Sequence, residues 1–402
     1  MKPIHFVLLL AVSPLAAAQT ATQWLAAEPG DLVAPANVTV KAALPSLNDE
    51  QAPVSFEQTL DRRMSISAPT PHRASSRQFW LETDGAALKA GLSVPTTAKG
   101  SLIRISSARN AGKATALDSS QLWLNDGAKV LTDGAGIKAL ADGEALQAAA
   151  PFPENTLAFK LDDSIAAGMV KVGTFQSVDD QAKFVVHVFE PNSDKTAELM
   201  MEQNGYFSGQ TFKAQLALKG ITADRKGING FAVSPSGEMV DLKFTANGEQ
   251  WSAVGTASDE PGMWEVHVFA NGTTKAGNAV IRNIRIPVAI TAPTARLMGQ
   301  ASGNAQALSV ALSVDVAGRY AIRGVLYGTD AQGQMVPASG SESARWLTPG
   351  QHTIALTFAA QSIDGLTAPF ELRHLQLLDQ SRMGVLHSQQ RAARLIAHQD
   401  FR

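Results

Sequence analysis

Apolar and polar residues alternate in several short stretches of this chain. The most regular stretch, 264–269, reads Trp-Glu-Val-His-Val-Phe. Successive side chains of an extended strand point to opposite faces, so its first, third and fifth residues predict the buried face of a β-strand. The same pattern occurs at 184–189, and a looser copy at 320–325 also begins with an aromatic residue. This repetition predicts three strand-built modules in a row, each with one such central strand.

Residues 194–291 show the strand pattern most clearly. Short apolar stretches alternate there with turn signals such as Asn204-Gly205 and Asn271-Gly272. The expected strands are 197–203, 212–218, 228–233, 238–244, 251–256, 264–269 and 279–290. About seven short strands in about 100 residues, with a turn every 8–12 residues, are typical of an immunoglobulin-like sandwich.

Two further modules flank this one. Residues 76–193 are interpreted as an N-terminal β-rich domain with one short helix, predicted at 137–150 from its Ala and Leu content and ended by Pro151. Residues 292–402 contain the strict alternation of 308–314 and predict a second immunoglobulin-like β-sandwich domain. The predicted fold class is therefore mainly β, with tandem antiparallel β-sandwich domains.

The two ends of the chain have a different character. Residues 19–75 are rich in Pro and Ala, and we expect this N-terminal segment to be partly mobile. Its alternating stretches 54–56 and 64–66 are predicted to add edge strands to the module that follows. Near the other end, Arg391 and Arg394 are interpreted as parts of a solvated basic tail.

Residues 1–18 have the parts of a secretory signal peptide. Lys2 supplies a positive start, 6–12 is an apolar run, and 16–18 are small residues suited to cleavage. The alternative, a membrane anchor, is less favoured because the run is shorter than the roughly 20 apolar residues that span a bilayer. We therefore expect a periplasmic or secreted protein without a transmembrane segment.

Composition agrees with a β-rich, exported protein. Charged residues make up only 17% of the chain, against roughly 25% in average domains, and 32 Gly and 19 Pro suit many turns. No cysteine is present, so disulfides are excluded and each module needs its own hydrophobic core. The formal net charge is −2 and there is no basic stripe, which argues against nucleic acid as a partner.

Two acidic pairs are the first candidates for chemistry, and both belong to the N-terminal β-rich domain. They are Asp162 with Asp163, and Asp179 with Asp180. Paired carboxylates can hold calcium or serve as acid and base. Calcium loops space their ligands at alternate positions, which adjacent pairs do not, and Asp is also common in turns. We interpret these residues as solvated turns, with a structural calcium site as the alternative.

The repeated strands offer a second set of candidates. His187 and His267 occupy equivalent positions, and Phe189 and Phe269 share their face of each strand. A histidine beside an aromatic ring on an exposed sheet can bind a sugar or a peptide. Two histidines in separate modules do not make a metal site, which needs several convergent ligands. We expect half-exposed strand residues whose face is covered by a neighbouring module or loop.

Residues 134–139 fit the pattern G-x-G-x-x-A after a short apolar stretch at 130–131. In a dinucleotide-binding fold such glycines let a pyrophosphate approach a helix N-terminus. No series of alternating strands and helices surrounds the motif, so we interpret it as a turn ahead of a helix and expect no cofactor. The G-x-S-x-G, P-loop and H-E-x-x-H motifs are absent from the sequence. A triad assembled from distant residues stays open.

Several stretches resemble one known family. They are 122–124, 183–191, 262–270, 284–287, 318–330 and 369–380. The chain is similar over most of its length after about residue 50 to exported bacterial proteins known only as a domain of unknown function. The resemblance implies an N-terminal β domain followed by two immunoglobulin-like modules, and it implies no catalytic residues. The middle module also looks like modules with a calcium-type loop, but its segment 247–259 is poor in carboxylates.

Together these patterns predict an exported, non-catalytic β-sandwich protein. It would act as a binding or structural module in the cell envelope or outside the cell, with a protein, a peptide or a glycan as partner. The alternative is a secreted hydrolase or its accessory subunit, with the site in the N-terminal domain that holds the acidic pairs. The ligand and the oligomeric state stay open.

Overall fold

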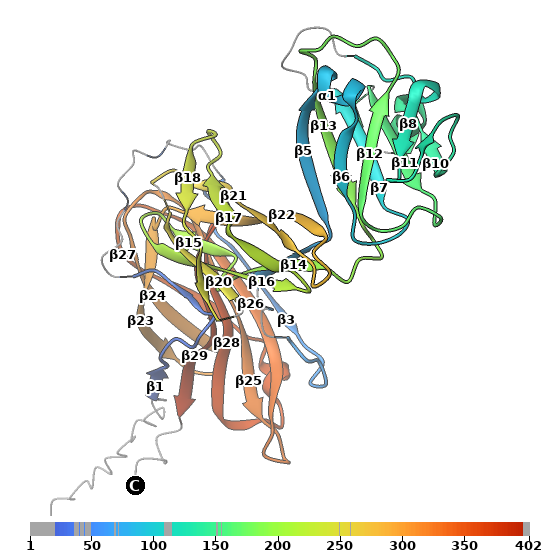
Figure 1. Cartoon of the computed structure of the whole chain (residues 1–402). Helices are drawn as coiled ribbons and strands as arrows, with labels where there is room; N and C mark the ends of the chain where they lie inside the picture. The colour runs from blue at the N-terminus through green and yellow to red at the C-terminus, as the bar shows by residue number, and fades with distance from the viewer. Residues whose placement is uncertain are drawn as a thin grey trace, which may run out of the picture. The chain divides into compact units, whose positions relative to one another are not determined.

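A computed structural model describes residues 21–35, 40, 44, 50–67, 70, 72–107, 115–149, 152–153, 155–248, 250–257 and 259–396. The predicted signal peptide, residues 1–18, lies outside them. The structure is 60% strand and 5% helix, which confirms the predicted β class. It divides into two compact units, residues 70–290 and residues 1–69 with 291–402 (Figure 1). Within the described residues no helix is long and apolar enough to cross a membrane.

The N-terminal module, residues 76–193, is a pair of antiparallel sheets. One sheet has the order β10-β11-β7-β13-β5 and the other β6-β12-β8-β9. The strands are β5 Gln78–Asp84, β6 Leu92–Pro95, β7 Leu102–Ser107, β8 Leu122–Asn125, β9 Val130–Leu131, β10 Ile137–Ala141, β11 Thr156–Leu161, β12 Met169–Thr174 and β13 Lys183–Phe189. Phe184, Val186 and Val188 of β13 are buried in one cluster with Val170 and Val172 of β12. The predicted central strand of this module is thereby confirmed.

The helices of this module differ from the prediction. The stretch 137–150 forms strand β10 first, and helix α2 covers only Gly143–Ala149. Pairing of β10 with β11 outweighs the helix propensity of its Ala and Leu residues. A second helix, α1 Gly85–Ala90, was not predicted; Asp84 caps it by accepting a hydrogen bond from the Ala87 amide at 3.0 Å. A 3₁₀ turn, η1 Ser119–Gln121, precedes β8.

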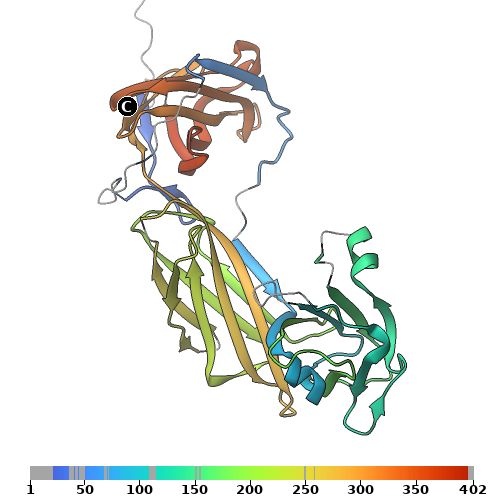
Figure 2. The same ribbon diagram turned by 90° about the horizontal axis from the view of Figure 1, so that it is seen from above.

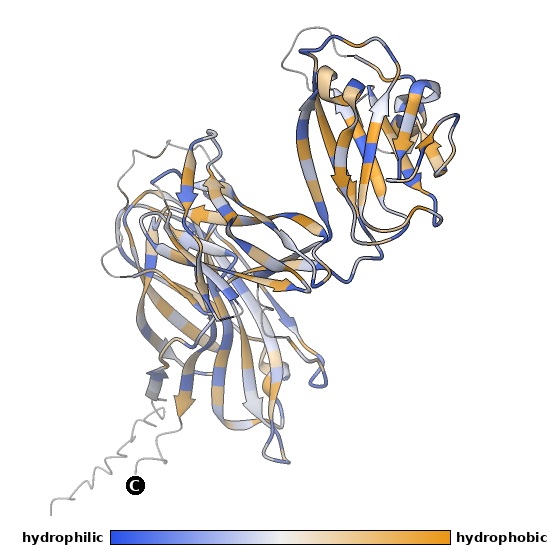
Figure 3. Cartoon of the chain, in the orientation of Figure 1, coloured by the Kyte–Doolittle hydropathy of each residue, from blue (hydrophilic) through white to orange (hydrophobic). Residues whose placement is uncertain are grey.

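The middle sandwich consists of β4 and β14 to β22. Its sheets have the orders β19-β20-β16-β14-β4 and β15-β22-β21-β17-β18. The strands are β4 His72–Ser76, β14 Thr196–Met201, β15 Gly205–Phe207, β16 Thr211–Lys219, β17 Thr222–Val233, β18 Met239–Leu242, β19 Thr245–Asn247, β20 Gln250–Thr256, β21 Gly262–Thr273 and β22 Ala279–Thr291. Trp264, Val266 and Val268 of β21 are at most 2% exposed and pack in one core with residues of the opposite sheet, as predicted. Figure 3 shows the same alternation as orange and blue bands along the strands.

The terminal sandwich contains both ends of the described chain. Its seven-stranded sheet has the order β1-β29-β28-β25-β26-β3, with β2 also paired to β29, and its three-stranded sheet has the order β23-β24-β27. The strands are β1 Ala21–Trp24, β2 Leu32–Val33, β3 Val54–Thr59, β23 Ala295–Gly303, β24 Ala307–Val314, β25 Gly318–Thr329, β26 Met335–Leu347, β27 Gly350–Thr357, β28 Thr367–Asp379 and β29 Gly384–Ile396, with a 3₁₀ turn η2 Ala360–Ile363. Tyr320, Ile322 and Leu326 of β25 are fully buried, which confirms the third predicted central strand.

The N-terminal segment does not serve the module that follows it, which corrects the prediction. Residues 54–56 belong to β3, which pairs with β26 of the terminal sandwich, and 64–66 form no strand. Strand β4, at the end of this segment, pairs with β14 of the middle sandwich (Figure 2). Alternation shows that a strand exists, but the partner edge depends on contacts remote in sequence.

The basic tail is also corrected. Arg391 and Arg394 lie in β29, which pairs with β28 along the sheet. Arg391 binds Glu371 of β28, with Nη2 and Oε1 2.8 Å apart. The few apolar residues at the end of the sequence gave no strand pattern that would have revealed this.

Replacing the buried indole of the middle sandwich tests its core. We expect Trp264→Ala to lower the free energy of unfolding by about 3–5 kcal/mol, because a large buried ring is lost and a cavity remains. The neighbouring Met263 is 61% exposed, so Met263→Ala should change stability by less than about 0.5 kcal/mol. Urea unfolding followed by circular dichroism measures both, and equal losses would contradict the assigned faces of β21.

Candidate functional site

The acidic pairs of the N-terminal module lie in turns. An Asp162 carboxylate oxygen accepts a hydrogen bond from the Ser164 amide at 2.9 Å, and Asp163 pairs with Lys138 at 2.7 Å. The bond from Ser164 lowers the pKa of Asp162, and that from Lys138 lowers the pKa of Asp163. These carboxylates are engaged as negative charges, as in solvated turns.

The second pair is engaged in the same way. Asp179 accepts a hydrogen bond from the Gln181 amide at 2.9 Å, and Asp180 pairs with Lys89 of α1. Across the described ranges, no three His, Asp or Glu side chains converge to hold a metal ion. A calcium site at these turns stays a prediction.

The histidine and phenylalanine candidates lie along a run of rings. Trp80 of β5 contacts His187, with centroids 6.5 Å apart, and Phe269, with centroids 6.4 Å apart. Phe231 stacks on Phe269 at 5.7 Å and on His267 at 5.2 Å. The outer face of β21 is therefore covered in part by a tryptophan of the N-terminal module, as expected for Phe269. Phe189 is not part of this run of rings, and the residue is 37% exposed.

Each histidine also has a polar partner. His187 lies 2.9 Å from a side-chain oxygen of Gln78, and burial lowers the pKa of His187 to about 4. Arg104, its register neighbour on β7, shifts this pKa in the same direction. His267 lies 3.1 Å from Glu265, which also pairs with Arg285. The two histidines are half-buried strand residues.

The glycine motif at 134–139 leads into a strand. Gly134 and Gly136 have positive φ values of 76° and 81°, and β10 follows directly. The Gly136 carbonyl accepts the Asp162 amide at 2.8 Å. The motif is a tight turn between β9 and β10, and the predicted helix does not begin there.

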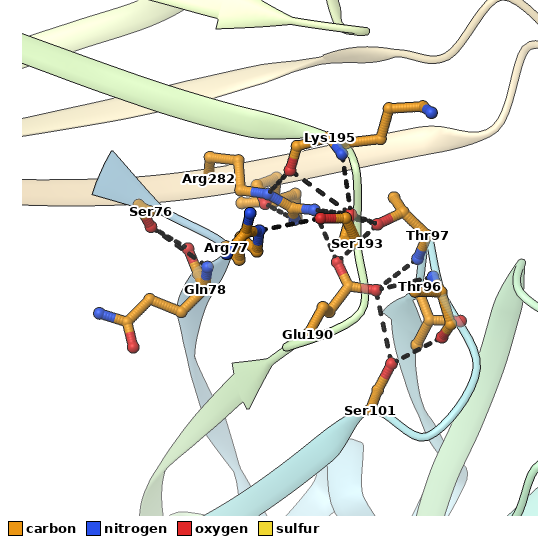
Figure 4. Close-up of polar contacts among 12 residues, drawn as sticks. Ser76, Arg77, Gln78, Thr96, Thr97, Ser101, Glu190, Ser193, Lys195 and Arg282 are labelled. Carbon is orange, nitrogen blue, oxygen red and sulfur yellow. Dashed lines mark hydrogen bonds and ion pairs between the residues drawn. The ribbon is translucent and has the colours of Figure 1, made fainter.

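A buried ion pair joins the N-terminal module to the middle sandwich (Figure 4). Arg282 of β22 and Glu190, which follows β13, are both fully buried, with Nη2 and Oε2 2.8 Å apart. Arg282 also donates to the carbonyls of Lys195 and Ile281 and to the hydroxyl of Ser193. Burial lowers the pKa of Arg282, and the attraction of Glu190 opposes that shift.

The carboxylate side of this pair is equally well satisfied. Glu190 accepts from the amides of Thr97 and Ala98 and from the hydroxyls of Thr97 and Ser101. A buried charge of this kind is tolerated only when its hydrogen bonds are complete. Because both buried charges find their hydrogen-bond partners within the protein, we assign this cluster a structural role at the junction.

The terminal sandwich carries a groove on the outer face of its seven-stranded sheet. Its volume is about 430 Å³. The lining residues are Phe56, Gln58, Ser67, Arg323, Gly324, Val325, Gly340, Ser341, Glu342, His374, Gln376, Ser388 and Gln390. All of them belong to the unit made by residues 1–69 and 291–402. The volume is within the range of roughly 300–1,000 Å³ that is common for small-molecule sites.

Strand register places one row of side chains across the groove. Phe56 of β3 is opposite Glu342 of β26, which is opposite Arg323 of β25. Arg323 is opposite Gln376 of β28, and Gln376 is opposite Ser388 of β29. Residues that are paired in register point to the same face of a sheet, so five strands contribute one polar row with an aromatic ring at its end.

A second row of residues, beside the polar row, lines the floor of the groove and the side opposite the polar row. Gln58, Gly340 and Val325 are paired in register across β3, β26 and β25. A Cβ atom added to Gly340 would meet no atom within 4 Å, so the floor is open at this glycine. A register shift between β25 and β28 accompanies His374, whose φ is +51°. Such a bulge re-aims a side chain, and here His374 lines the groove.

Charge within the groove is sparse and balanced. Among the described lining residues, Arg323 is the cation and Glu342 the carboxylate. Burial lowers the pKa of His374, a hydrogen bond with Gln390 opposes that shift and the nearby Arg373 adds to it, so the neutral imidazole is favoured. The groove therefore offers hydrogen-bond donors and acceptors with one charge of each sign.

Sequence patterns did not point to this groove. The alternation around 320–325 predicted a strand but gave no information on which strands lie beside it. Phe56 comes from a segment that we assigned to another module. Knowledge of the β3–β26 pairing would have been needed to find the site.

Two models of one protein family match this chain. A family model described as the domain of unknown function (DUF4785) N-terminal domain matches residues 45–190. The model of the DUF4785 C-terminal domain matches residues 294–396, and the two together span more than half of the chain. The chain belongs to the DUF4785 family. The C-terminal match contains strands β23 to β29, which carry most of the groove.

Solved structures agree with membership of DUF4785. A DUF4785 family protein from Legionella pneumophila is 16% identical, with 90% of this chain and 98% of that chain covered and a TM-score of 0.70. At this identity the likeness shows the shared fold alone. An Anoxybacillus pullulanase complexed with maltotriose, 8% identical over 45% of this chain and 24% of its own, has a TM-score of only 0.19 and carries no argument. Among curated proteins nothing matches the chain.

Breaking the buried ion pair should destabilise the unit formed by residues 70–290. We expect Glu190→Gln to lower its free energy of unfolding by about 3–5 kcal/mol, because Arg282 would remain buried without a counter-charge. The control is Glu265→Gln at the exposed pair with Arg285, which should cost less than about 1 kcal/mol. Urea unfolding followed by tryptophan fluorescence measures both, and a fully stable Glu190→Gln variant would contradict the structural role.

Titration of His187 should make the same unit less stable in acid. Its folded-state pKa of about 4 lies below the roughly 6.5 of an unfolded histidine. Between these values only the unfolded chain binds the proton, so the contribution to stability is complete above pH 6.5 and is lost as pH falls. From pH 7 to 4.5 the wild type should lose on the order of 2 kcal/mol more than His187→Gln, after allowance for partial solvation of the ring. Parallel urea-unfolding results for the two proteins across this range would refute the assignment.

Proposed function

We propose that this protein is an exported, non-catalytic binding protein whose ligand is a glycan held in the groove of the terminal sandwich. The observation that carries the proposal is the polar row from Phe56 to Ser388. Export rests on the signal-peptide pattern of residues 1–18. The terminal sandwich, which we interpret as immunoglobulin-like, is the frame of the site.

The chemistry of the lining favours a glycan. Each sugar hydroxyl both donates and accepts a hydrogen bond, and Gln58 and Gln390 carry both functions on one planar amide. The Phe56 ring is 59% exposed and presents an apolar face on which a pyranose ring can stack. The groove thus combines planar polar groups with one aromatic platform.

This groove is less suited to binding a peptide. Extended peptides commonly add a strand to a free sheet edge and bind through main-chain hydrogen bonds. The groove lies on the face of the sheet, where the backbones of β26, β25 and β28 are already paired on both sides. Recognition there depends on side chains, and those present suit hydroxyl groups.

The same lining speaks against hydrolysis. Most glycoside hydrolases need two carboxyl groups that flank the scissile bond. The described part of the lining holds one, Glu342. The acidic pairs of the N-terminal module are bound to turn amides and lysines, so they give no specific support to the alternative of a hydrolase.

Loss of groove side chains should weaken glycan binding without affecting the fold. We expect Phe56→Ala and Gln390→Ala each to raise the Kd for a glycan selected on an array by about tenfold, since a stacking or hydrogen-bonding partner is lost. Phe175→Ala, at a 63% exposed ring of the N-terminal module, is the matched control and should bind normally. Isothermal titration calorimetry on the full mature chain gives the Kd values.

Two results would overturn the proposal. One is normal glycan binding by both groove variants at unchanged melting temperature, which would place the site elsewhere. The other is the appearance of shortened glycans after incubation with the protein, which would remove the non-catalytic assignment.

A further inference from the structure

We infer that the glycan bound in the groove carries a carboxylate, which the guanidinium of Arg323 binds, so that the ligand class is an acidic saccharide containing uronic acid residues. This inference rests on the proposed function and adds the charge of the ligand to it. Arg323 lies in the middle strand of the five that form the groove.

The side chain of Arg323 is held on one side only. Its Nε atom donates to a side-chain oxygen of Gln376 at 2.6 Å, which turns the guanidinium toward β28. Glu342 is its register partner on β26, yet no ion pair joins the two side chains, and Glu342 accepts a hydrogen bond from Gln380 at 3.4 Å. In the described part of the chain, no carboxylate lies within ion-pair distance of Arg323. Among the described residues nothing is bonded to its two terminal nitrogens, and because the side chain lines the groove this fork of donors is available to a ligand there.

Three other arginines in or beside this sheet pair with carboxylates. Arg373 and Arg391 both bind Glu371, at 2.7 and 2.8 Å, and Arg382, between β28 and β29, binds Asp379 at 3.0 Å. Arg323 is exposed and lines the groove without such a partner. A planar guanidinium matches a carboxylate through two parallel hydrogen bonds.

Glu342 restricts the charge of the anion. It stands next to Arg323 in the row, and cross-strand neighbours are about 5 Å apart at Cβ. A dianionic phosphate at the fork would lie close to this carboxylate and be repelled. A carboxylate carries a single charge and is repelled about half as strongly, while Glu342 can accept hydrogen bonds from hydroxyl groups of the same sugar ring. A uronic acid unites both features in one residue.

The remaining lining fits the rest of such a residue. Ser388 and Gln376 continue the row beyond Arg323, and Phe56 closes its opposite end. A carboxylate at the fork therefore has hydroxyl partners on one side and, beyond Glu342, an aromatic platform on the other. The order of the row sets the order of the groups that the ligand must present.

Matched pairs of saccharides test this inference. The probes are trimers of galacturonic, glucuronic and mannuronic acid, the methyl ester of each trimer, and the neutral trimer of the parent sugar. An ester keeps the ring and its hydroxyls and removes the charge. For at least one sugar we expect the acid to bind the full mature chain at least about tenfold more tightly than its ester, with a preference that shrinks as salt is added. Isothermal titration calorimetry measures the Kd values.

Two variants assign the preference to Arg323. Arg323→Gln should bring the acid and its ester to the same Kd, and Arg323→Lys should retain part of the difference because the charge remains without the fork. The control is Arg345→Gln, which removes the same charge from an exposed residue of β26 that is not part of the groove lining. This control should keep the full preference, and circular dichroism spectra establish that all three variants are folded.

The possible outcomes separate this inference from the proposed function. Equal binding of acid and ester by the wild type overturns the inference and leaves glycan binding in place. An acid preference that survives in Arg323→Gln also overturns it, as would tighter binding of a sulfated or phosphorylated trimer than of any uronate. If neither acids, esters nor neutral trimers bind, and the glycan array is also blank, the proposed function itself fails.

Discussion

Pairing between strands that are far apart in sequence is the constraint on which the rest of this structure depends. With no cysteine in the chain, nothing covalent ties these segments together. The clearest case is β3, which takes its place at the edge of a sheet whose other members, apart from β1 and β2, begin after residue 317. All six residues of β3 are exposed. This strand is held mainly by the ladder to β26, because it contributes no side chain to a core.

The unit formed by residues 70–290 consists of two β modules, and the contacts that join them are of a different kind. A short segment between modules gives little apolar area, and domain interfaces within a chain are usually polar. Here the joint combines the aromatic run through Trp80 with a fully desolvated pair, Arg282 and Glu190. A desolvated pair of charges adds less to stability than an apolar contact, but it is satisfied in one arrangement only. The hydrogen bonds around it thus define how β22 meets the end of β13.

Much of the fold was readable from periodicity, and most of the groove was not. The alternation that begins at Trp264, Phe184 and Tyr320 predicted three buried strands. Alternation of apolar residues is a local signal, and the burial of these side chains confirms the prediction. Strand β10 was misread as helix, since its Ala and Leu residues favour a helix locally and only its pairing with β11 decides otherwise. The groove required the neighbours of each strand to be known, and register across β3, β26, β25, β28 and β29 is a property of the folded chain. No spacing in the sequence links Phe56 to Ser388.

The position of the groove on the outward side of regular strands has an evolutionary consequence. Neighbouring residues on one strand belong to different environments: Ile322 is locked into the core, whereas Arg323, next to it, touches the solvent side. Mutation at the outward positions leaves interior packing intact. Selection can therefore change the side chains that contact a ligand one at a time. Descendants of a common ancestor could keep the same scaffold while they diverge in what they capture.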